Sequence, residues 1–284
     1  MSRVICISSQ KGGVGKTTTT VNLSTALALA ERSCLVVDFD PQGHATQGLR
    51  AIHRCGKETL WQAMTGKTSI REAIVPTSLK FLHLLPSSRE LLKAEAALQR
   101  MGAKEKRLST LLSGLRSEYD FILIDTPPAL SLLTVNGLVA ADSLMIPLQC
   151  EFYALMGLRH YLRFVAVLKE HLHQTLQLEG LLLSMLRERV RCHPIVDKIR
   201  SGFGENVFRT AIPWDWDILD SAAHGKPLLL QDVRSTSSRL YLELAGEITN
   251  GRKRTGSCED FDFAAAARVT GSGTAREECF STRV

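Results

Sequence analysis

The stretch 8–23, SSQKGGVGKTTTTVNL, decides the fold. It follows a short apolar run and precedes apolar residues at helical spacing, which predicts a strand, a glycine-rich loop and a helix in that order. Gly15, Lys16 and Thr17 match the second half of the phosphate-binding pattern G-x-x-x-x-G-K-[ST]. A glutamine stands where that pattern has its first glycine, and Lys11 follows it as a second lysine. The role of Lys11 is therefore the question that the sequence raises.

The loop is suited to binding phosphate groups. Glycines let successive backbone N–H groups turn toward one oxyanion, and the N-terminus of the next helix adds its positive end. Lys16 can reach the β- and γ-phosphates of a nucleotide, and the hydroxyl of Thr17 can ligate Mg²⁺. The alternative is a glycine-rich turn without a ligand. The order of strand, glycines, lysine, threonine and helix argues against it.

Three aspartates follow apolar strands. Asp125 ends the run FILID, and the carboxyl end of a strand faces the crevice in which α/β sheets bind ligands. We predict that Asp125 holds Mg²⁺ through water. Asp38 and Asp40 end another run, in VVDFDPQG, and we predict that Asp40 orients a water molecule for attack on the γ-phosphate. Asp38 is predicted to be structural; a loop-capping role for either residue is the alternative.

Short apolar runs alternate with helical patterns along the chain. This alternation predicts an α/β fold with a doubly wound, mainly parallel sheet and helices on both faces. The predicted strands are 4–8, 34–39, 121–124, 143–148 and 180–185, with a weaker one at 82–85.

The composition changes near residue 250. Residues 251–284 contain no leucine or isoleucine and are rich in Gly, Ser, Thr, Ala and Arg. Such a segment buries little apolar surface. We therefore predict one domain over residues 1–250 and a disordered tail over 251–284.

The bulk composition is that of an ordinary soluble protein, with 44% hydrophobic and 23% charged residues. No apolar run reaches the roughly 18 residues of a membrane-spanning helix, and the N-terminus lacks the features of a signal peptide. These features predict a cytoplasmic protein. Seven cysteines without a C-x-x-C pair argue against a disulfide framework and a zinc site. The net charge of +6 permits an anionic partner.

Five motifs together resemble one known family. The chain is similar to the ParA-type partitioning ATPases of the ParA/MinD superfamily, Soj-like P-loop ATPases with a deviant Walker A loop, over about residues 3–249. The motifs are KGGVGKTT at 11–18, VVDFDPQG at 36–43, ILIDTPP at 122–128, LTVNGL at 133–138 and EFYALMGL at 151–158.

The resemblance implies an answer to the question about Lys11. In that family the early lysine reaches across a nucleotide-sandwich homodimer to the ATP of the partner subunit. A lysine that pairs with phosphates of another subunit makes dimerisation depend on bound ATP. The resemblance also implies weak ATPase activity that a centromere-binding, ParB-type partner stimulates, and ATP-dependent binding to DNA without sequence preference.

Site residues follow from the same resemblance. Catalytic roles fall to Lys11, Lys16 and Asp40, and Mg²⁺ to Thr17 and Asp125. Contacts to ATP are implied for Lys11, Gly12, Gly13, Val14, Gly15, Lys16, Thr17, Thr18 and Pro213.

The stretch 212–227, IPWDWDILDSAAHGKP, departs from the family pattern. Pro213 fits it. Trp214–Asp217 do not, and two acids stand where the family has basic residues near its adenine and DNA surface. Met156 also replaces a glutamate. A separate basic cluster predicts DNA phosphate contacts, with a solvated helix face as the alternative. The cluster also contains Lys198 and Arg209, and the contacts are predicted for Arg187, Arg189, Arg191 and Arg200.

Three other functions share the loop. A MinD-like membrane switch requires a basic amphipathic helix at the C-terminus, which the leucine-free tail does not offer. A reductase of the nitrogenase iron-protein type requires paired cysteines for an iron–sulfur cluster. A biosynthetic ligase on the same fold would require a substrate pocket, and this alternative remains open.

Overall fold

The computed structural model describes residues 2–49, 59–100, 102–151, 153–187, 194–250 and 261–269. Seven strands in this part of the chain form one sheet in the order β3-β4-β2-β5-β1-β6-β7. All neighbouring strands are parallel except β3 and β4. The strands are β1 (Arg3–Ile7), β2 (Cys34–Asp38), β3 (Val75–Pro76), β4 (Leu82–Leu85), β5 (Phe121–Asp125), β6 (Ser143–Gln149) and β7 (Gln177–Ser184).

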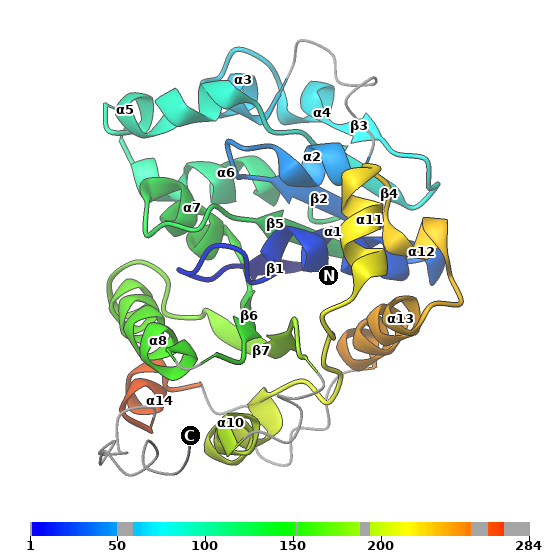
Figure 1. Cartoon of the computed structure of the whole chain (residues 1–284). Helices are drawn as coiled ribbons and strands as arrows, with labels where there is room; N and C mark the ends of the chain where they lie inside the picture. The colour runs from blue at the N-terminus through cyan, green and yellow to red at the C-terminus, as the bar shows by residue number, and fades with distance from the viewer. Residues whose placement is uncertain are drawn as a thin grey trace.

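Helices cover both faces of this sheet (Figure 1). The first face carries α3 (Leu60–Met64), α6 (Arg107–Ser113), α7 (Leu132–Ala140), α8 (Ala154–His171), α10 (Pro194–Phe203) and α14 (Phe263–Val269). The second carries α1 (Lys16–Leu29), α2 (His44–Gly48), α11 (Trp216–Ala223), α12 (Leu228–Gln231) and α13 (Thr236–Thr249). The shorter helix α4 (Ile70–Ala73) lies near β3, and α5 (Ala94–Leu98) contacts α7.

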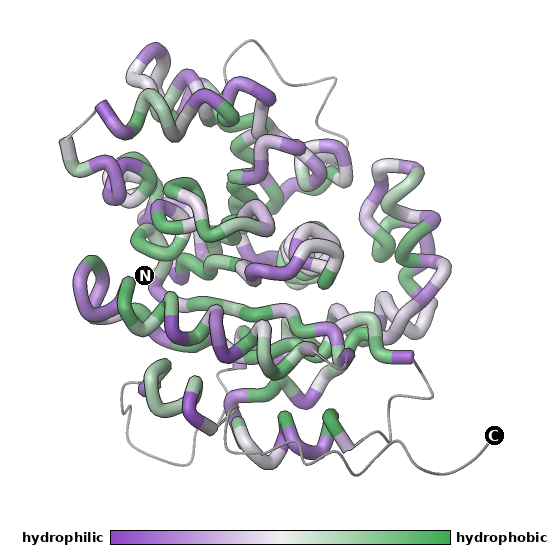
Figure 2. Tube along the Cα trace, turned by 60° about the vertical axis from the view of Figure 1, so that its left-hand side comes forward, coloured by the Kyte–Doolittle hydropathy of each residue, from purple (hydrophilic) through white to green (hydrophobic). Residues whose placement is uncertain are grey.

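The strands are buried on both sides because their apolar runs are continuous. In β1, Val4 and Cys6 pack toward the first face, while Ile5 and Ile7 pack toward the second. Figure 2 shows the hydrophobic residues concentrated in the middle of the molecule, between the layers. The doubly wound α/β fold predicted from the sequence is confirmed. The strand β3 was not predicted, since two residues are too few for a recognisable pattern.

The segment after residue 250 differs in part from its prediction. Residues 263–269 are not disordered but form α14, which packs on α8 with Phe263 2% exposed and Ala267 1% exposed. Lys169 of α8 lies over the ring of Phe263 at 5.8 Å from its centroid. Phenylalanine and alanine supply the apolar face that the missing leucines and isoleucines would otherwise provide. The division into a domain and a tail stays a prediction.

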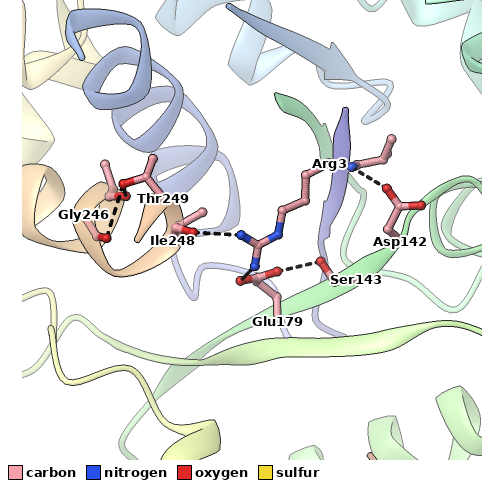
Figure 3. Close-up of polar contacts among 9 residues, drawn as sticks. Arg3, Asp142, Ser143, Glu179, Gly246, Ile248 and Thr249 are labelled. Carbon is pink, nitrogen blue, oxygen red and sulfur yellow. Dashed lines mark hydrogen bonds and ion pairs between the residues drawn. The ribbon is translucent and has the colours of Figure 1, made fainter. Parts of the chain in front are cut away.

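A polar cluster fastens the last helix of the second face to the sheet, at the edge opposite to the glycine-rich loop (Figure 3). The guanidinium of Arg3 donates to the carbonyl of Ile248 at 2.8 Å and pairs with Glu179 at 2.5 Å. Glu179 is 4% exposed and also accepts from the hydroxyl of Ser143 at 2.7 Å. A buried carboxylate is thus fully partnered, and α13 is held where it packs against α1.

Among the described residues, none of the helices combines the length and the apolar character needed to cross a bilayer.

Candidate functional site

The glycine-rich loop joins β1 to α1 at the carboxyl end of the sheet, as predicted. Gly13 and Gly15 adopt φ angles of 71° and 87°, which residues with a side chain rarely adopt, so the loop requires glycine at both positions. The hydroxyl of Ser184, at the end of β7, donates to the carbonyl of Val14 at 2.7 Å. Two glycines therefore give the loop its backbone conformation, and a hydrogen bond from the edge strand β7 holds it in place.

Lys16 lies inside the curve of this loop. It is 6% exposed, and its ammonium donates to the carbonyl of Lys11 at 3.1 Å. Burial lowers the pKa of Lys16, while the charges of Asp125 and Asp40 oppose that shift. A partly dehydrated ammonium group beside the backbone of a glycine-rich loop is suited to the phosphates of a nucleotide.

Thr17 and Asp125 form the second part of the site. The hydroxyl of Thr17 donates to one carboxyl oxygen of Asp125 at 2.7 Å, and the hydroxyl of Thr20 donates to the other at 3.3 Å. Asp125 is fully buried, and its pKa is raised to about 8 by burial first and by the charge of Asp38 second.

These groups fit Mg²⁺. The ion prefers oxygen ligands and typically takes one or two from the protein and the rest from phosphates and water. A buried carboxyl with a raised pKa beside a threonine hydroxyl is a place where a cation is stabilised. Within the described part of the chain, no cluster of three or more His, Cys, Asp or Glu forms a separate metal site.

Asp38 and Asp40 follow one another at the end of β2 but have different surroundings. Asp38 is fully buried and accepts from Thr46 through its backbone N–H at 2.7 Å and its hydroxyl at 2.6 Å. Burial raises the pKa of Asp38 to about 6, against the effect of these hydrogen bonds. Asp38 therefore joins the end of β2 to α2, which agrees with its predicted structural role.

Asp40 lies in the turn just beyond the strand. One carboxyl oxygen of Asp40 accepts from the backbone N–H of Gln42 at 2.9 Å. The backbone carbonyl of Asp40 accepts from the hydroxyl of Ser87 at 2.5 Å. The side chain is 6% exposed and close enough to Lys16 to affect its pKa. The turn thus holds a carboxylate beside the loop, which is the position that the prediction of a water-orienting residue requires.

The side chain of Lys11 contacts the end of β6 and the segment that follows it. Its ammonium forms an ion pair with Glu151 and donates to the side chain of Gln149 at 3.3 Å. The side chains of Lys11 and Glu151 are 48% and 50% exposed. Glu151 was not among the predicted site residues. It is the first residue of the motif EFYALMGL and comes just after β6, the strand beside β1.

Pro213 lies close to the end of the glycine-rich loop and the first turn of α1. It lines a small cavity of about 30 Å³ together with Gly15, Thr18, Thr19 and Trp214. The structure therefore brings Pro213 to the residues with which it was predicted to bind nucleotide.

The four predicted DNA contacts are only partly described. Arg187 lies over the ring of Trp214, 5.8 Å from its centroid. Arg200 on α10 donates to the carbonyls of Phe208 and Arg209 at 3.4 and 3.3 Å. Arg189 and Arg191 lie outside the described residues.

Asp215, one of the two unusual acids of the 214–217 stretch, has a structural role. Asp215 is the N-cap of α11: its carboxylate accepts from the backbone of Asp217 at 3.0 Å and from the hydroxyl of Ser237. It thereby joins the starts of α11 and α13. An acidic residue before a helix was a capping signal that the sequence analysis did not use.

Comparison with known proteins agrees with this geometry. A family model described as an AAA domain matches residues 2–178. Over 249 residues the chain is 42% identical to the chromosome partitioning protein ParA of Myxococcus xanthus, an alignment that covers 87% of this chain and 88% of that protein. The chain belongs to the ParA/Soj family. It is also 39% identical over 249 residues to the sporulation initiation inhibitor protein Soj of Bacillus subtilis, covering 87% of this chain and 98% of that one.

Solved structures place this ParA/Soj family chain in a wider fold group. Cobyrinic acid a,c-diamide synthase from Mycobacterium smegmatis, with bound ADP and magnesium, superposes with a TM-score of 0.77 at 29% identity. That match covers 92% of this chain and 99% of the synthase. The cell division ATPase MinD of Pyrococcus furiosus gives 0.73 at 26% identity, covering 88% and 99% of the two chains.

Proposed function

We propose that this chain is a Mg²⁺-dependent ATPase that forms a homodimer when ATP is bound and takes part in chromosome or plasmid partitioning. The observation that carries the proposal is the grouping of Lys16, Thr17, Asp40 and Asp125 around one glycine-rich loop. The named relatives at 42% and 39% identity support the partitioning role. A synthase bound to ADP and magnesium on the same fold supports the ligands.

Each residue then has a distinct part in hydrolysis. Lys16 and the loop N–H groups bind the β- and γ-phosphates and orient them. Thr17 and Asp125 would hold Mg²⁺, which would supply positive charge beside the phosphates. Asp40 orients the attacking water, and its proximity to Lys16 keeps that water close to the terminal phosphate. Thr46 supports the step indirectly, because it fixes Asp38 and thereby the turn that carries Asp40.

Lys11 accounts for the dimer in this proposal. On its own chain its ammonium is paired with Glu151, whereas its backbone carbonyl accepts from Lys16. Binding of a partner subunit with ATP offers it a phosphate, a stronger partner than a half-exposed carboxylate. ATP-dependent dimerisation follows from that difference.

The proposed partners are a centromere-binding, ParB-type protein and DNA of any sequence. Support for the DNA contact comes from the charge of +6 and from Arg187, which is exposed at the surface. Arg200 contributes less than expected, because two backbone carbonyls already occupy its guanidinium. Replacement of Arg187 by Glu should weaken binding to every duplex alike, measured by fluorescence anisotropy across a salt series with ATP and with ADP. Equal weak binding in both nucleotide states would contradict the DNA contact but not the ATPase.

Single-turnover ATP hydrolysis tests the catalytic assignment. Asp40→Ala should bind ATP and dimerise but lose roughly 10²–10⁴ in rate, the range for a positioned proton acceptor. Glu243→Ala, an exposed carboxylate change on α13, is the matched control and should hydrolyse at the wild-type rate. Wild-type turnover by Asp40→Ala would place the catalytic carboxylate elsewhere.

The ligase alternative is addressed by the same assay. The structural likeness to the cobyrinic acid diamide synthase keeps that reaction class in view, but its 29% identity is below the 42% to a partitioning protein. A partitioning ATPase hydrolyses ATP with water as the only acceptor. Hydrolysis that occurs only when a carboxylic acid and an amine donor are added would favour the ligase.

A further inference from the structure

Three large apolar side chains lie exposed together where α11 begins. Trp216 is 70% exposed, Leu219 43% and Trp214 36%. The indole rings of Trp214 and Trp216 meet edge to face, with centroids 4.8 Å apart. Trp216 and Leu219 are three residues apart on the helix and so share one side of it. We call these three residues the tryptophan patch; Figure 1 shows α11 at the outside of the second helical face.

The fold does not require this patch. Ile218 and Ser221, on the other side of α11, are the residues that the helix buries. Asp215 caps the helix, and Asp220 accepts from the side chain of Gln231 at 2.7 Å, which joins α11 to the end of α12. Exposed tryptophan adds nothing to these contacts, and burying an indole against a partner releases a large apolar area from water. Contiguous exposed apolar surface of this kind marks an interaction site.

Charge at the patch restricts the partner. The carboxylate of Asp217 is exposed and makes no hydrogen bond or ion pair with any residue that the structure describes. Asp220 is also exposed, one turn further along the helix. Among the described side chains, Arg187 is stacked on the ring of Trp214, and His224 lies 3.4 Å from the carboxylate of Asp220. Two exposed carboxylates on α11 repel phosphate groups and attract cations, so the surface of α11 favours a cationic partner, and the proposed DNA contact is left to Arg187 beside Trp214.

We propose that the tryptophan patch binds a basic amphipathic peptide segment of a protein partner. Apolar side chains of the segment cover Trp214, Trp216 and Leu219, and its lysine or arginine side chains pair with Asp217 and Asp220. The site differs from the proposed nucleotide site, although Trp214 and Leu219 line the same small cavity as Gly15 and Thr18. The proposal does not depend on ATP binding, so it is tested without nucleotide.

The test is a tryptophan fluorescence titration of the full chain. The probe is a synthetic amphipathic helical peptide with leucine on one face and lysine on the other, and the comparison peptide carries glutamate in place of lysine. The chain has three tryptophans, and Trp61 is partly buried, so the signal reports mainly on the patch. The lysine peptide should bind about tenfold or more tightly than the glutamate peptide, and less so at high salt.

Variants on the exposed surface show where the peptide binds. Trp216→Ala should weaken binding of the lysine peptide by about tenfold or more, since aromatic anchors dominate such contacts. Asp217→Lys should reverse the preference toward the glutamate peptide. Val167→Ser and Glu170→Lys are matched exposed changes on α8, on the other face of the sheet, and should bind as wild type does. Because Trp216→Ala removes part of the fluorescence signal, peptide binding to this variant is measured by the anisotropy of labelled peptide.

Several outcomes would overturn the proposal. These are equal affinity for both peptides, wild-type affinity in Trp216→Ala or Asp217→Lys, and equal losses in the α8 variants. Tighter binding of a single-stranded oligonucleotide than of the lysine peptide would identify the patch as a base-stacking surface instead. Absence of any saturable signal would also count against it. Thermal unfolding by circular dichroism confirms that each variant is folded.

Discussion

The ion pair between Lys11 and Glu151 should oppose dimerisation, and Glu151→Gln measures by how much. The substitution removes the negative charge but keeps a hydrogen-bond acceptor of the same shape beside the lysine. Both side chains are about half exposed, so the pair contributes about 0.2–1 kcal/mol. A dimer in which both lysines change partner loses two such pairs, about 0.4–2 kcal/mol. The ATP-bound dimer of Glu151→Gln should therefore form roughly 2- to 30-fold more tightly than wild type.

Sedimentation velocity with a slowly hydrolysed ATP analogue and Mg²⁺ provides the dimerisation constant. The difference between variant and wild type should shrink as salt rises, because screening weakens the pair in the monomer. Lys11→Ala should bind the analogue and stay monomeric, while Glu243→Gln serves as a charge control distant from the loop. A dimer that is unchanged or weaker in Glu151→Gln would refute the reasoning. A weaker dimer would show that Glu151 acts across the interface.

Three further outcomes are expected. Lys16→Ala should lose ATP binding, measured with labelled nucleotide, because no other described side chain donates into the loop from the same position. Asp125, whose pKa is about 8, is mostly protonated in the empty protein at pH 7 and must ionise to hold Mg²⁺. Binding of Mg²⁺ and ATP should thus release close to one proton at pH 7 and fewer by pH 9, and calorimetry in buffers of different ionisation enthalpy should show no such release for Asp125→Asn. Phe263→Ala should lower the free energy that holds α14 on α8 by about 3–5 kcal/mol, because the ring is buried. Amide hydrogen exchange should therefore become faster in α14 and stay unchanged in the sheet. Exchange in α14 as slow as in wild type would show that the ring does not hold the helix.

Some parts of this structure could be predicted because their signal is local. The loop carries its strand, glycines, lysine and threonine within one short stretch, and the strands are apolar runs that lie between two helical layers. Asp125 and Asp40 could be assigned to the site edge because each follows such a run. Parallel strands place their carboxyl ends at the same edge, so residues distant in sequence meet there.

Other parts depend on contacts that no local pattern contains. Glu151 lies 140 residues from Lys11, and only the adjacency of β6 and β1 brings the two together. The basic cluster looked like a phosphate-binding surface because arginines are close in sequence. The carbonyls that occupy Arg200 come from the turn after α10 and are visible only in three dimensions. The helix α14 was missed since phenylalanine and alanine in a polar segment bury area only when α8 is there to receive them.

The buried carboxylates of this site make the stability of the nucleotide-free protein depend on pH. Asp38 and Asp125 are fully buried, and burial raises the pKa of both; the charge of Asp38 adds to the shift of Asp125, and the charge of Asp40 adds to both shifts. A carboxyl whose pKa is higher in the folded than in the unfolded chain favours folding at low pH, and that contribution is lost as pH rises through about 6 for Asp38 and about 8 for Asp125. At neutral pH the fold therefore buries two carboxyl groups that resist ionisation. Hydrogen bonds from Thr46 and Thr17 lower the free-energy cost of ionising them. A bound cation removes the repulsion, so the arrangement that destabilises the empty protein is the same one that stabilises its complex with Mg²⁺ and nucleotide.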